Sequence, residues 1–117
     1  MANPNIAAAT SILGYALNTT LTTSSAIIVQ QSLTDTVYKI NSIVACNTGA
    51  SAITVTVGLS MPSTIRFIAK EIAVPANTTL VVVSKETSFY LRESCEIHAQ
   101  ASANSSCDLT ISYEIIS

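Results

Sequence analysis

Residues 107–117 read CDLTISYEIIS, and apolar residues occupy every second position of this stretch as far as residue 115. The apolar positions are Cys107, Leu109, Ile111, Tyr113 and Ile115, and the polar positions between them are Asp108, Thr110, Ser112 and Glu114. A period of two residues is typical of a β-strand with one buried face. Because the pattern continues without a polar tail, we expect this strand to be held inside a sheet rather than to fray.

The stretch before it, residues 95–103 (CEIHAQASA), alternates in the same way. One face would carry Cys95, Ile97, Ala99 and Ala101, and the opposite face Glu96, His98, Gln100 and Ser102. Residues 104–106 are typical of a turn, so we predict that these last two strands form a hairpin.

A second hairpin is predicted from residues 37–47 (VYKINSIVACN) and 52–60 (AITVTVGLS), because the connection between them contains Gly49. In the second strand, the apolar face comprises Ile53, Val55, Val57 and Leu59. In the first strand, the face expected to be shared comprises Tyr38, Ile40, Ser42, Val44 and Cys46. Lys39 and Asn41 are expected to point the other way.

Further strands are predicted at residues 25–31, 65–74, 78–84 and 88–91. The segment 65–74 can be one strand or a strand broken near Lys70, and 78–84 is expected to be mostly buried. About eight strands at this spacing favour an all-β fold, a single antiparallel β-sandwich of the jelly-roll type. No internal repeat is evident, and the length of 117 residues suits one domain.

The first 24 residues show only weak periodicity, with Pro4 near the start and Gly14 in the middle. The Ala-rich stretch 6–17 is open to a helical interpretation, but it has no apolar stripe at helical spacing. We therefore predict an extended N-terminal arm over residues 1–24 and a β-sandwich domain over residues 25–117.

Only 10% of the residues are charged, whereas about a quarter is usual for soluble domains. A surface this poor in charge is often covered by neighbouring subunits, although a monomer solubilised by hydroxyl and amide groups is the alternative. With a net charge of −2 and scattered basic residues, nucleic-acid binding is not expected. There is no run of about 18 apolar residues and no basic signal-peptide region, which predicts no membrane partner and assembly in a cytoplasm.

The cysteines Cys46, Cys95 and Cys107 are odd in number and widely spaced, which argues against a disulfide framework and against a zinc site. Cys46 and Cys107 fall in strand patterns and are expected to be small buried apolar residues. The sequence does not decide whether Cys95 and Cys107 form a disulfide bond across the last predicted hairpin.

His98 is the sole histidine, and Glu96 is expected on the same strand face two residues away. No nucleophile or third group is marked out beside this pair, and Cys95 falls on the opposite face. The seven Asp and Glu residues are spread singly, and phosphate-binding glycine loops are absent. We predict no catalytic, cofactor-binding or metal site, no cofactor and no enzymatic activity.

Four stretches together carry a resemblance: MANPNI, KINSIVACN, VPANTTLVVVSKETSFYLRE and ASANSSCDLTISYEIIS. They resemble small virion structural proteins of tailed bacteriophages, notably those of marine cyanobacteria, and residues 73–116 carry the most specific part. The resemblance implies a β-sandwich component of the virion, of the kind that decorates or cements a capsid through contacts with the major capsid protein or other virion proteins. It carries over no functional residues.

Three functions follow as hypotheses. The first is a capsid decoration or cement protein whose arm, residues 1–24, orders on the shell. The second is a tail, neck or fibre component, and the third is a carbohydrate-binding module or small enzyme. The third is disfavoured because the chain lacks Trp and its tyrosines mostly fall in core-like positions. Open strand edges would cause aggregation unless covered, so a homo-oligomer is expected, with a trimer as the first guess from analogy.

Overall fold

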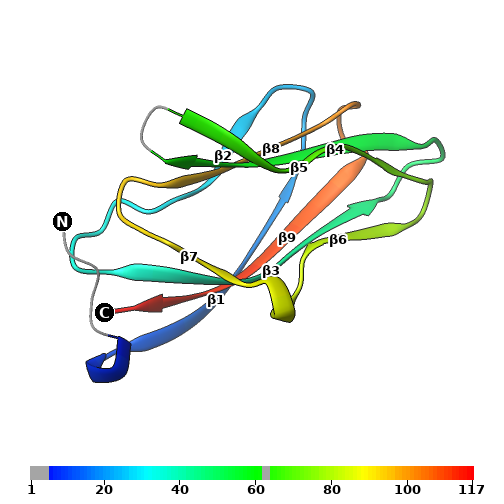
Figure 1. Cartoon of the computed structure of the whole chain (residues 1–117). Coiled ribbons are helices and arrows are strands. Elements are labelled where there is room, and N and C mark those ends of the chain that lie inside the picture. Colours follow the sequence, from blue (N-terminus) through cyan, green and yellow to red (C-terminus); the bar gives the residue numbers. More distant parts are fainter. Residues whose placement is uncertain (1–5, 62–63) are drawn as a thin grey trace.

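The computed structural model describes residues 6–61 and 64–117, which form two antiparallel β-sheets packed face to face (Figure 1). Sheet A has the order β1-β9-β3-β6, with β7 also paired to β3, and sheet B has the order β2-β8-β4-β5. The strands are β1 (Ile12–Thr20), β2 (Ala26–Gln30), β3 (Val37–Asn47), β4 (Ile53–Met61), β5 (Thr64–Val74), β6 (Thr79–Val83), β7 (Phe89–Leu91), β8 (Glu96–Ala101) and β9 (Cys107–Ile116). Two short 3-10 helices, η1 (Ile6–Ala8) and η2 (Lys85–Thr87), complete the described elements. The predicted all-β sandwich is confirmed.

Many successive strands lie in opposite sheets, and with β7 set aside the strand order is that of a jelly roll. Both predicted hairpins are therefore wrong. Residues 37–47 and 52–60 form β3 and β4, which belong to sheets A and B, and β8 and β9 are likewise in different sheets. The reason is that alternation indicates which face of a strand is buried, but it does not indicate which strand lies beside it.

β3 changes its buried face part-way along its length. Its pairing with β9 shifts register between Ile40 and Ser42, so that Asn41 is an extra residue in the ladder. The residues buried beyond this bulge are Ile43, Ala45 and Asn47. The predicted face that continued through Ser42, Val44 and Cys46 is therefore wrong, and these three residues are half-buried.

The core lies between the two sheets and consists mainly of aliphatic side chains. As predicted from the alternation, β9 buries Cys107, Leu109 and Ile111, and β8 buries Ile97, Ala99 and Ala101. β9 lies between β1 and β3 and pairs with both along its length. The expectation that this strand is held inside a sheet is therefore confirmed.

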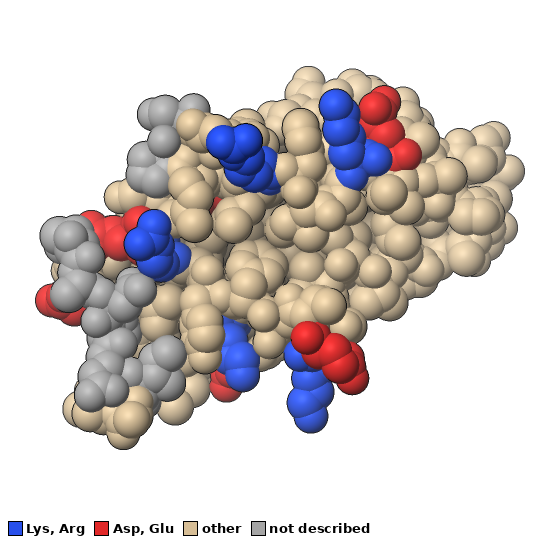
Figure 2. All heavy atoms as spheres, in the orientation of Figure 1, with Lys and Arg blue, Asp and Glu red and all other residues tan. Residues whose placement is uncertain are grey.

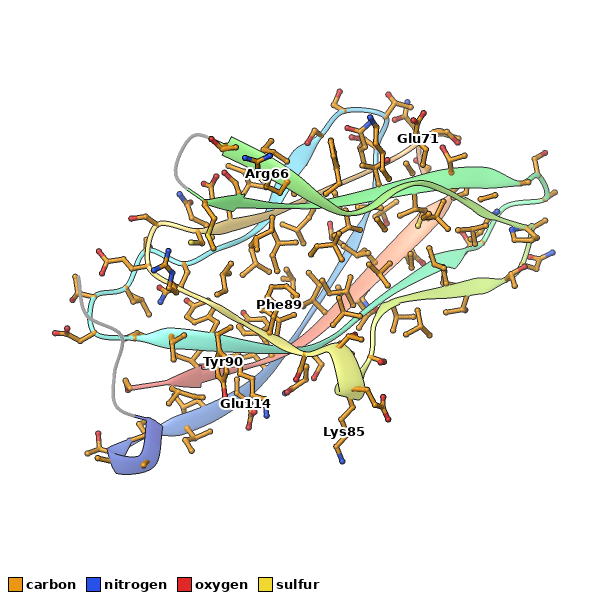
Figure 3. All side chains as sticks on the ribbon, in the orientation of Figure 1. Arg66, Glu71, Lys85, Phe89, Tyr90 and Glu114 are labelled. Carbon is orange, nitrogen blue, oxygen red and sulfur yellow. The ribbon has the colours of Figure 1, made fainter. Side chains whose placement is uncertain are left out.

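β6 lies at an edge of sheet A, and the expectation that residues 78–84 are mostly buried is wrong. Val83 is buried, but Val81 is 58% exposed because it lies on the outer face of the sheet, opposite to Leu80 and Val82, which pack against the core. In the neighbouring β7, Phe89 points between the sheets and packs against the core, whereas Tyr90 points outward (Figure 3).

Residues 12–20 are extended, as predicted for the N-terminal arm, and they form β1 at the edge of sheet A. Residues 6–8 form a single 3-10 turn and no longer helix. Leu21 follows β1, is 1% exposed and belongs to the core. The division of the chain at residue 24 stays a prediction, and residues 1–5 of the predicted arm lie outside the described residues.

Candidate assembly interface

The edge of sheet A at β1 is long, regular and uncharged. β1 pairs with β9 over all nine residues without a register shift, and its sequence, ILGYALNTT, contains no charged residue and no proline. Ile12, Leu13 and Tyr15 are 57%, 50% and 48% exposed. Leu13 and Tyr15 share the inner face with Leu17, which packs against the core, and Ile12 lies on the outer face. The exposed apolar surface therefore covers both sides of this edge.

Side-chain contacts hold β1 against β9. The Asn18 Nδ2 group donates a hydrogen bond of 2.8 Å to Thr110 Oγ1, and Thr20 Oγ1 donates one of 3.0 Å to Asp108 Oδ1. With the packing of Leu17, these contacts fix one backbone edge of β1 on the sheet. The other backbone edge, directed away from β9, has no strand beside it among the described residues.

Three tyrosines form a ladder across β1, β9 and β3. The ring centroids of Tyr15 and Tyr113 lie 5.9 Å apart and those of Tyr113 and Tyr38 lie 5.3 Å apart, with interplanar angles of 20° and 19°. Burial raises the pKa of Tyr38, and the neighbouring Tyr113 and Tyr15 raise it further. The prediction of core-like tyrosines holds for Tyr38 and the half-buried Tyr113, but it is wrong for Tyr15 and Tyr90, which are 48% and 47% exposed.

The edge of sheet B at β5 is also apolar, but it is irregular. Its exposed large apolar residues are Ile65, Phe67, Ile68 and Ile72. β5 is one continuous strand whose pairing with β4 shifts register twice, and Glu71 has a positive φ of 51° at one of these shifts. This irregularity lies close to Lys70, where the sequence allowed for an interruption of the strand. Lys70 Nζ lies 5.1 Å from the centroid of the Phe67 ring, so β5 carries charge as well as bulges.

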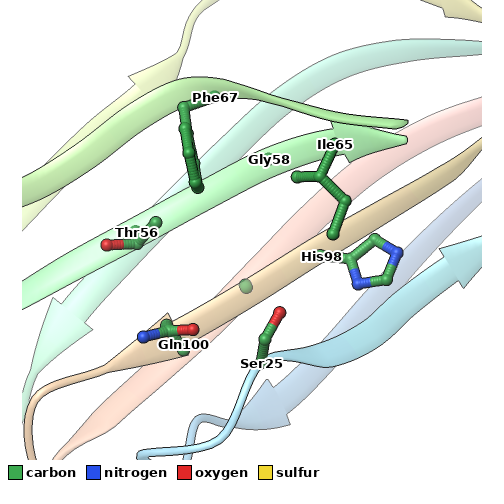
Figure 4. A pocket seen from close by; sticks show the side chains of 8 residues that line it. Ser25, Thr56, Gly58, Ile65, Phe67, His98 and Gln100 are labelled. Atoms are coloured by element: carbon green, nitrogen blue, oxygen red, sulfur yellow. The ribbon is translucent and has the colours of Figure 1, made fainter. Parts of the chain in front are cut away.

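A pocket of about 210 Å³ lies on sheet B, where side chains of β5 fold over Gly58 (Figure 4). Its lining residues are Ser25, Thr56, Gly58, Ile65, Phe67, His98, Ala99 and Gln100. A Cβ atom built on Gly58 would lie 2.8 Å from Ile65 Cγ2, so the glycine permits this close approach. The volume is below the ~300 Å³ at which pockets for drug-sized ligands begin. The sequence did not predict this pocket, because Phe67 reaches it only through the bulged pairing of β5.

His98 and Glu96 share the outer face of β8, the face directed away from the core, as predicted from alternation. His98 Nε2 lies 3.2 Å from Glu96 Oε1, and both side chains are largely buried, with 15% and 21% of their surface exposed. Cys95 is not part of this pair, and its Sγ lies 3.1 Å from Met61 Sδ. Within residues 6–61 and 64–117, no group of three His, Cys, Asp or Glu side chains could hold a metal ion.

All three cysteines are free thiols, so Cys95 and Cys107 do not form the bridge that the sequence left open. Cys107 is buried as predicted, whereas Cys46 is half-buried because of the bulge in β3. Burial, with smaller effects of the neighbouring Asp108 and Cys46, raises the pKa of the Cys107 thiol from 9.0 to about 11. The raised pKa favours the protonated, unreactive thiol at neutral pH.

We expect Cys107 to react with a maleimide far more slowly than Cys46 in the folded protein at pH 8. A shift of the pKa from 9.0 to about 11 lowers the thiolate fraction by about 100-fold at this pH, in addition to the steric protection of a residue that is 0% exposed. The same pKa shift also affects the free energy of unfolding. The contribution of the neutral Cys107 thiol to folding stability is complete below pH 9 and is lost as the pH rises through about 11. Mass spectrometry of labelled peptides, with and without urea, measures the difference. Equal native rates for Cys46 and Cys107 would contradict the prediction.

Charged side chains are few and scattered on the face shown in Figure 2, where uncharged residues form most of the surface. The described residues contain no helix long and apolar enough to cross a bilayer. The apolar edges at β1 and β5, rather than a polar site, are thus the distinctive exposed features of this molecule.

Solved structures of other proteins share this fold, among them a pilus chain and a chain of a viral particle. A chain from Bacillus endospore appendages, described as a novel family of disulfide-linked pili, is 14% identical with a TM-score of 0.58, and the match covers 100% of this chain and 96% of that one. A chain of the T13 IBDV viral particle is 8% identical with a TM-score of 0.53, and the match covers 90% of this chain but 31% of that one. At these identities the likeness shows the fold. No protein-family model and no curated protein sequence matches the chain.

Proposed function

We propose that this chain is a non-enzymatic structural subunit of a large protein assembly, in which its sheet edges contact neighbouring subunits. The observation that carries the proposal is the exposed apolar surface on both sides of β1, a regular edge that presents open backbone hydrogen-bonding groups. Such an edge promotes uncontrolled association unless a neighbour covers it. Neighbouring subunits that cover the surface would also account for the low content of charged residues, which is only 10% of the chain.

The specific role that we propose is decoration or cementing of a phage capsid, with the major capsid protein or other virion proteins as partners. This role comes from the resemblance of residues 73–116 to small virion proteins. The fold shared with a chain of the T13 IBDV viral particle is compatible with a place in a virion. In this role many copies bind neighbouring capsid subunits and raise the resistance of the shell to disruption.

A fibre, tail or neck subunit is the second candidate. The shared fold with a chain from disulfide-linked pili favours it, because the match spans nearly the whole of both chains. A carbohydrate-binding role has a weaker basis in the pocket beside Phe67, and a glycan-binding screen of the Phe67→Ala variant against the wild type tests it separately.

The deciding experiment is cryo-electron microscopy of the native particle that carries this protein. Copies that follow the icosahedral lattice and bridge capsid subunits are expected for the decoration role. A ring or a spike with few copies would replace that role with a tail or neck role. If purified particles lack the protein and the free chain stays monomeric at high concentration, the structural role itself is wrong.

A further inference from the structure

We propose that β1 pairs antiparallel with β1 of a second copy of this chain, so that the two copies of sheet A join in one continuous sheet across a twofold axis. The inference rests on the proposed structural role, and it names the partner of the β1 edge. It follows from a comparison of the open edges, from the sequence of β1 and from the unexplained glycine in the middle of that strand.

The other edges carry features that prevent extended pairing. β2 and β6 have five residues each, and β7 has three. β2 also shifts register between Ile27 and Val29. β5 is long, but two register shifts, the positive φ of Glu71 and the charge of Lys70 interrupt it. Short strands, bulges and charges are the devices by which edges avoid pairing, and β1 has none of them.

The same comparison selects a second β1 as the occupant. A partner strand can form backbone hydrogen bonds along all nine residues of β1 only if it is equally long and has no bulge. Among the described edge strands, β1 is the one that meets both conditions. In the register centred on Ala16, every residue of Ile12–Thr20 finds an opposite residue. A slip of two residues in either direction loses two of these pairs. Because β1 is uncharged, two copies approach without repulsion between their edges.

Gly14 fits this arrangement, although none of the described residues of its own chain requires a glycine there. Its φ is not positive, and a Cβ atom at this position would meet no atom of the described residues within 4 Å. Glycine in a strand weakens it and often marks a place where another backbone comes close. In the centred register, Gly14 lies opposite Asn18 of the second copy. The missing side chain leaves room above the strand between that Asn18 and Glu114, the partner of Gly14 on β9.

The area of this contact sets the expected strength. Nine residues span about 30 Å, so an edge about 10 Å thick buries on the order of 300 Å² per copy. That is well below the ~800 Å² per partner of a stable complex. The pairing is therefore expected to be weak between free molecules and to become effective where many copies are held side by side in an assembly.

Cysteine cross-linking of the full-length chain tests the pairing, because Ala16 meets Ala16 of the second copy at the axis. Opposite Cβ atoms in an antiparallel pair lie about 4.5–5.5 Å apart, close enough for a disulfide after a small adjustment. Under mild oxidation at high protein concentration, Ala16→Cys is expected to form about tenfold more covalent dimer than Val81→Cys. Val81 is the matched control, since it is exposed on edge strand β6. The wild-type protein measures the background from the native thiols.

The register has its own measurement. A mixture of Gly14→Cys and Asn18→Cys proteins is expected to form heterodimers, because those positions face each other, while each variant alone dimerises less. Circular dichroism confirms that the variants are folded, as expected for substitutions at exposed positions. Equal cross-linking of Ala16→Cys and Val81→Cys would overturn the pairing, and so would capture of a different protein by Ala16→Cys on native particles. If the protein is present on particles but the Ala16→Cys cross-link does not form, only the β1 pairing is rejected. If the cross-link forms specifically but the protein is absent from particles, only the proposed function is rejected.

Discussion

The Asn47→Ala variant is expected to lose about 3–5 kcal/mol of its free energy of unfolding. Asn47 is 0% exposed, and its Nδ2 group donates to the carbonyl oxygens of Ser51, Val74 and Pro75 at 2.9, 3.0 and 3.2 Å. Its Oδ1 accepts a hydrogen bond of 2.9 Å from the Gly49 backbone N–H. The side chain thus ties the β3–β4 connection to the end of β5. Alanine would leave these backbone groups without a partner, at a cost of about 1–3 kcal/mol for each group that stays buried.

Urea unfolding followed by circular dichroism measures this loss, and Asn41→Ala is the matched control. Asn41 lies in the same strand but is half-buried, and its Nδ2 is 3.4 Å from Glu114 Oε1. Its replacement is expected to cost less than about 0.5 kcal/mol. If both alanine variants lose equally little, the polar contacts of Asn47 contribute nothing beyond those of an ordinary surface amide.

The role of Asn47 also shows where sequence patterns stop being informative. Strict alternation correctly predicted the buried face of β8 throughout and that of β9 as far as Ile111, beyond which Tyr113 and Ile115 are half-buried and Ile116 is buried. In β3, the bulge at Asn41 moves the buried face by one residue and brings Asn47 into the core. A bulge arises from pairing with a partner strand, so the sequence of one strand does not reveal it.

The sequence also did not predict correctly which strands lie side by side. Turn residues around Gly49 and Asn104 led to two predicted hairpins, but the connections cross between the sheets. Alternation determines which residues face the core, and turn chemistry determines where the chain bends. Neither distinguishes a return within one sheet from a crossing to the opposite sheet, since both leave the same faces buried.

The candidate interface was not predicted from the sequence either. In β1 apolar residues fall on both faces, with Ile12 beside Leu13, and Gly14 and Ala16 weaken the alternation. A strand covered by a neighbouring subunit has no need for one polar face, so its pattern resembles that of an irregular segment. The low charge of the chain and the open strand edges expected of a sandwich both pointed to covered surface, but neither identified β1 as the covered edge. The arm over residues 1–24 was expected to order on the shell, not to form an edge strand of a sheet.

Deletion of residues 1–24 is expected to abolish cooperative folding of residues 25–117. The deletion removes Leu21, which is 1% exposed and whose N–H donates to the Cys107 carbonyl at 2.8 Å, together with Leu17 and the whole β1 ladder. Loss of a buried leucine side chain alone costs about 2–5 kcal/mol, against a total stability of about 5–15 kcal/mol for most domains. Thermal unfolding followed by circular dichroism measures the result, with the full-length protein as reference.

A synthetic peptide of residues 12–24, added to the 25–117 fragment, is the control that separates loss of β1 from general misfolding. The peptide is expected to restore cooperative unfolding, because β9 would offer it the open edge that β1 normally occupies. A peptide with Leu17 and Leu21 replaced by serine should restore much less, since both side chains contact the core. If the fragment alone unfolds cooperatively at the wild-type temperature, the arm and the sandwich are separable as the sequence predicts. In that case β1 could leave its own sheet and pair elsewhere in an assembly, and the twofold β1 contact would no longer be the expected one.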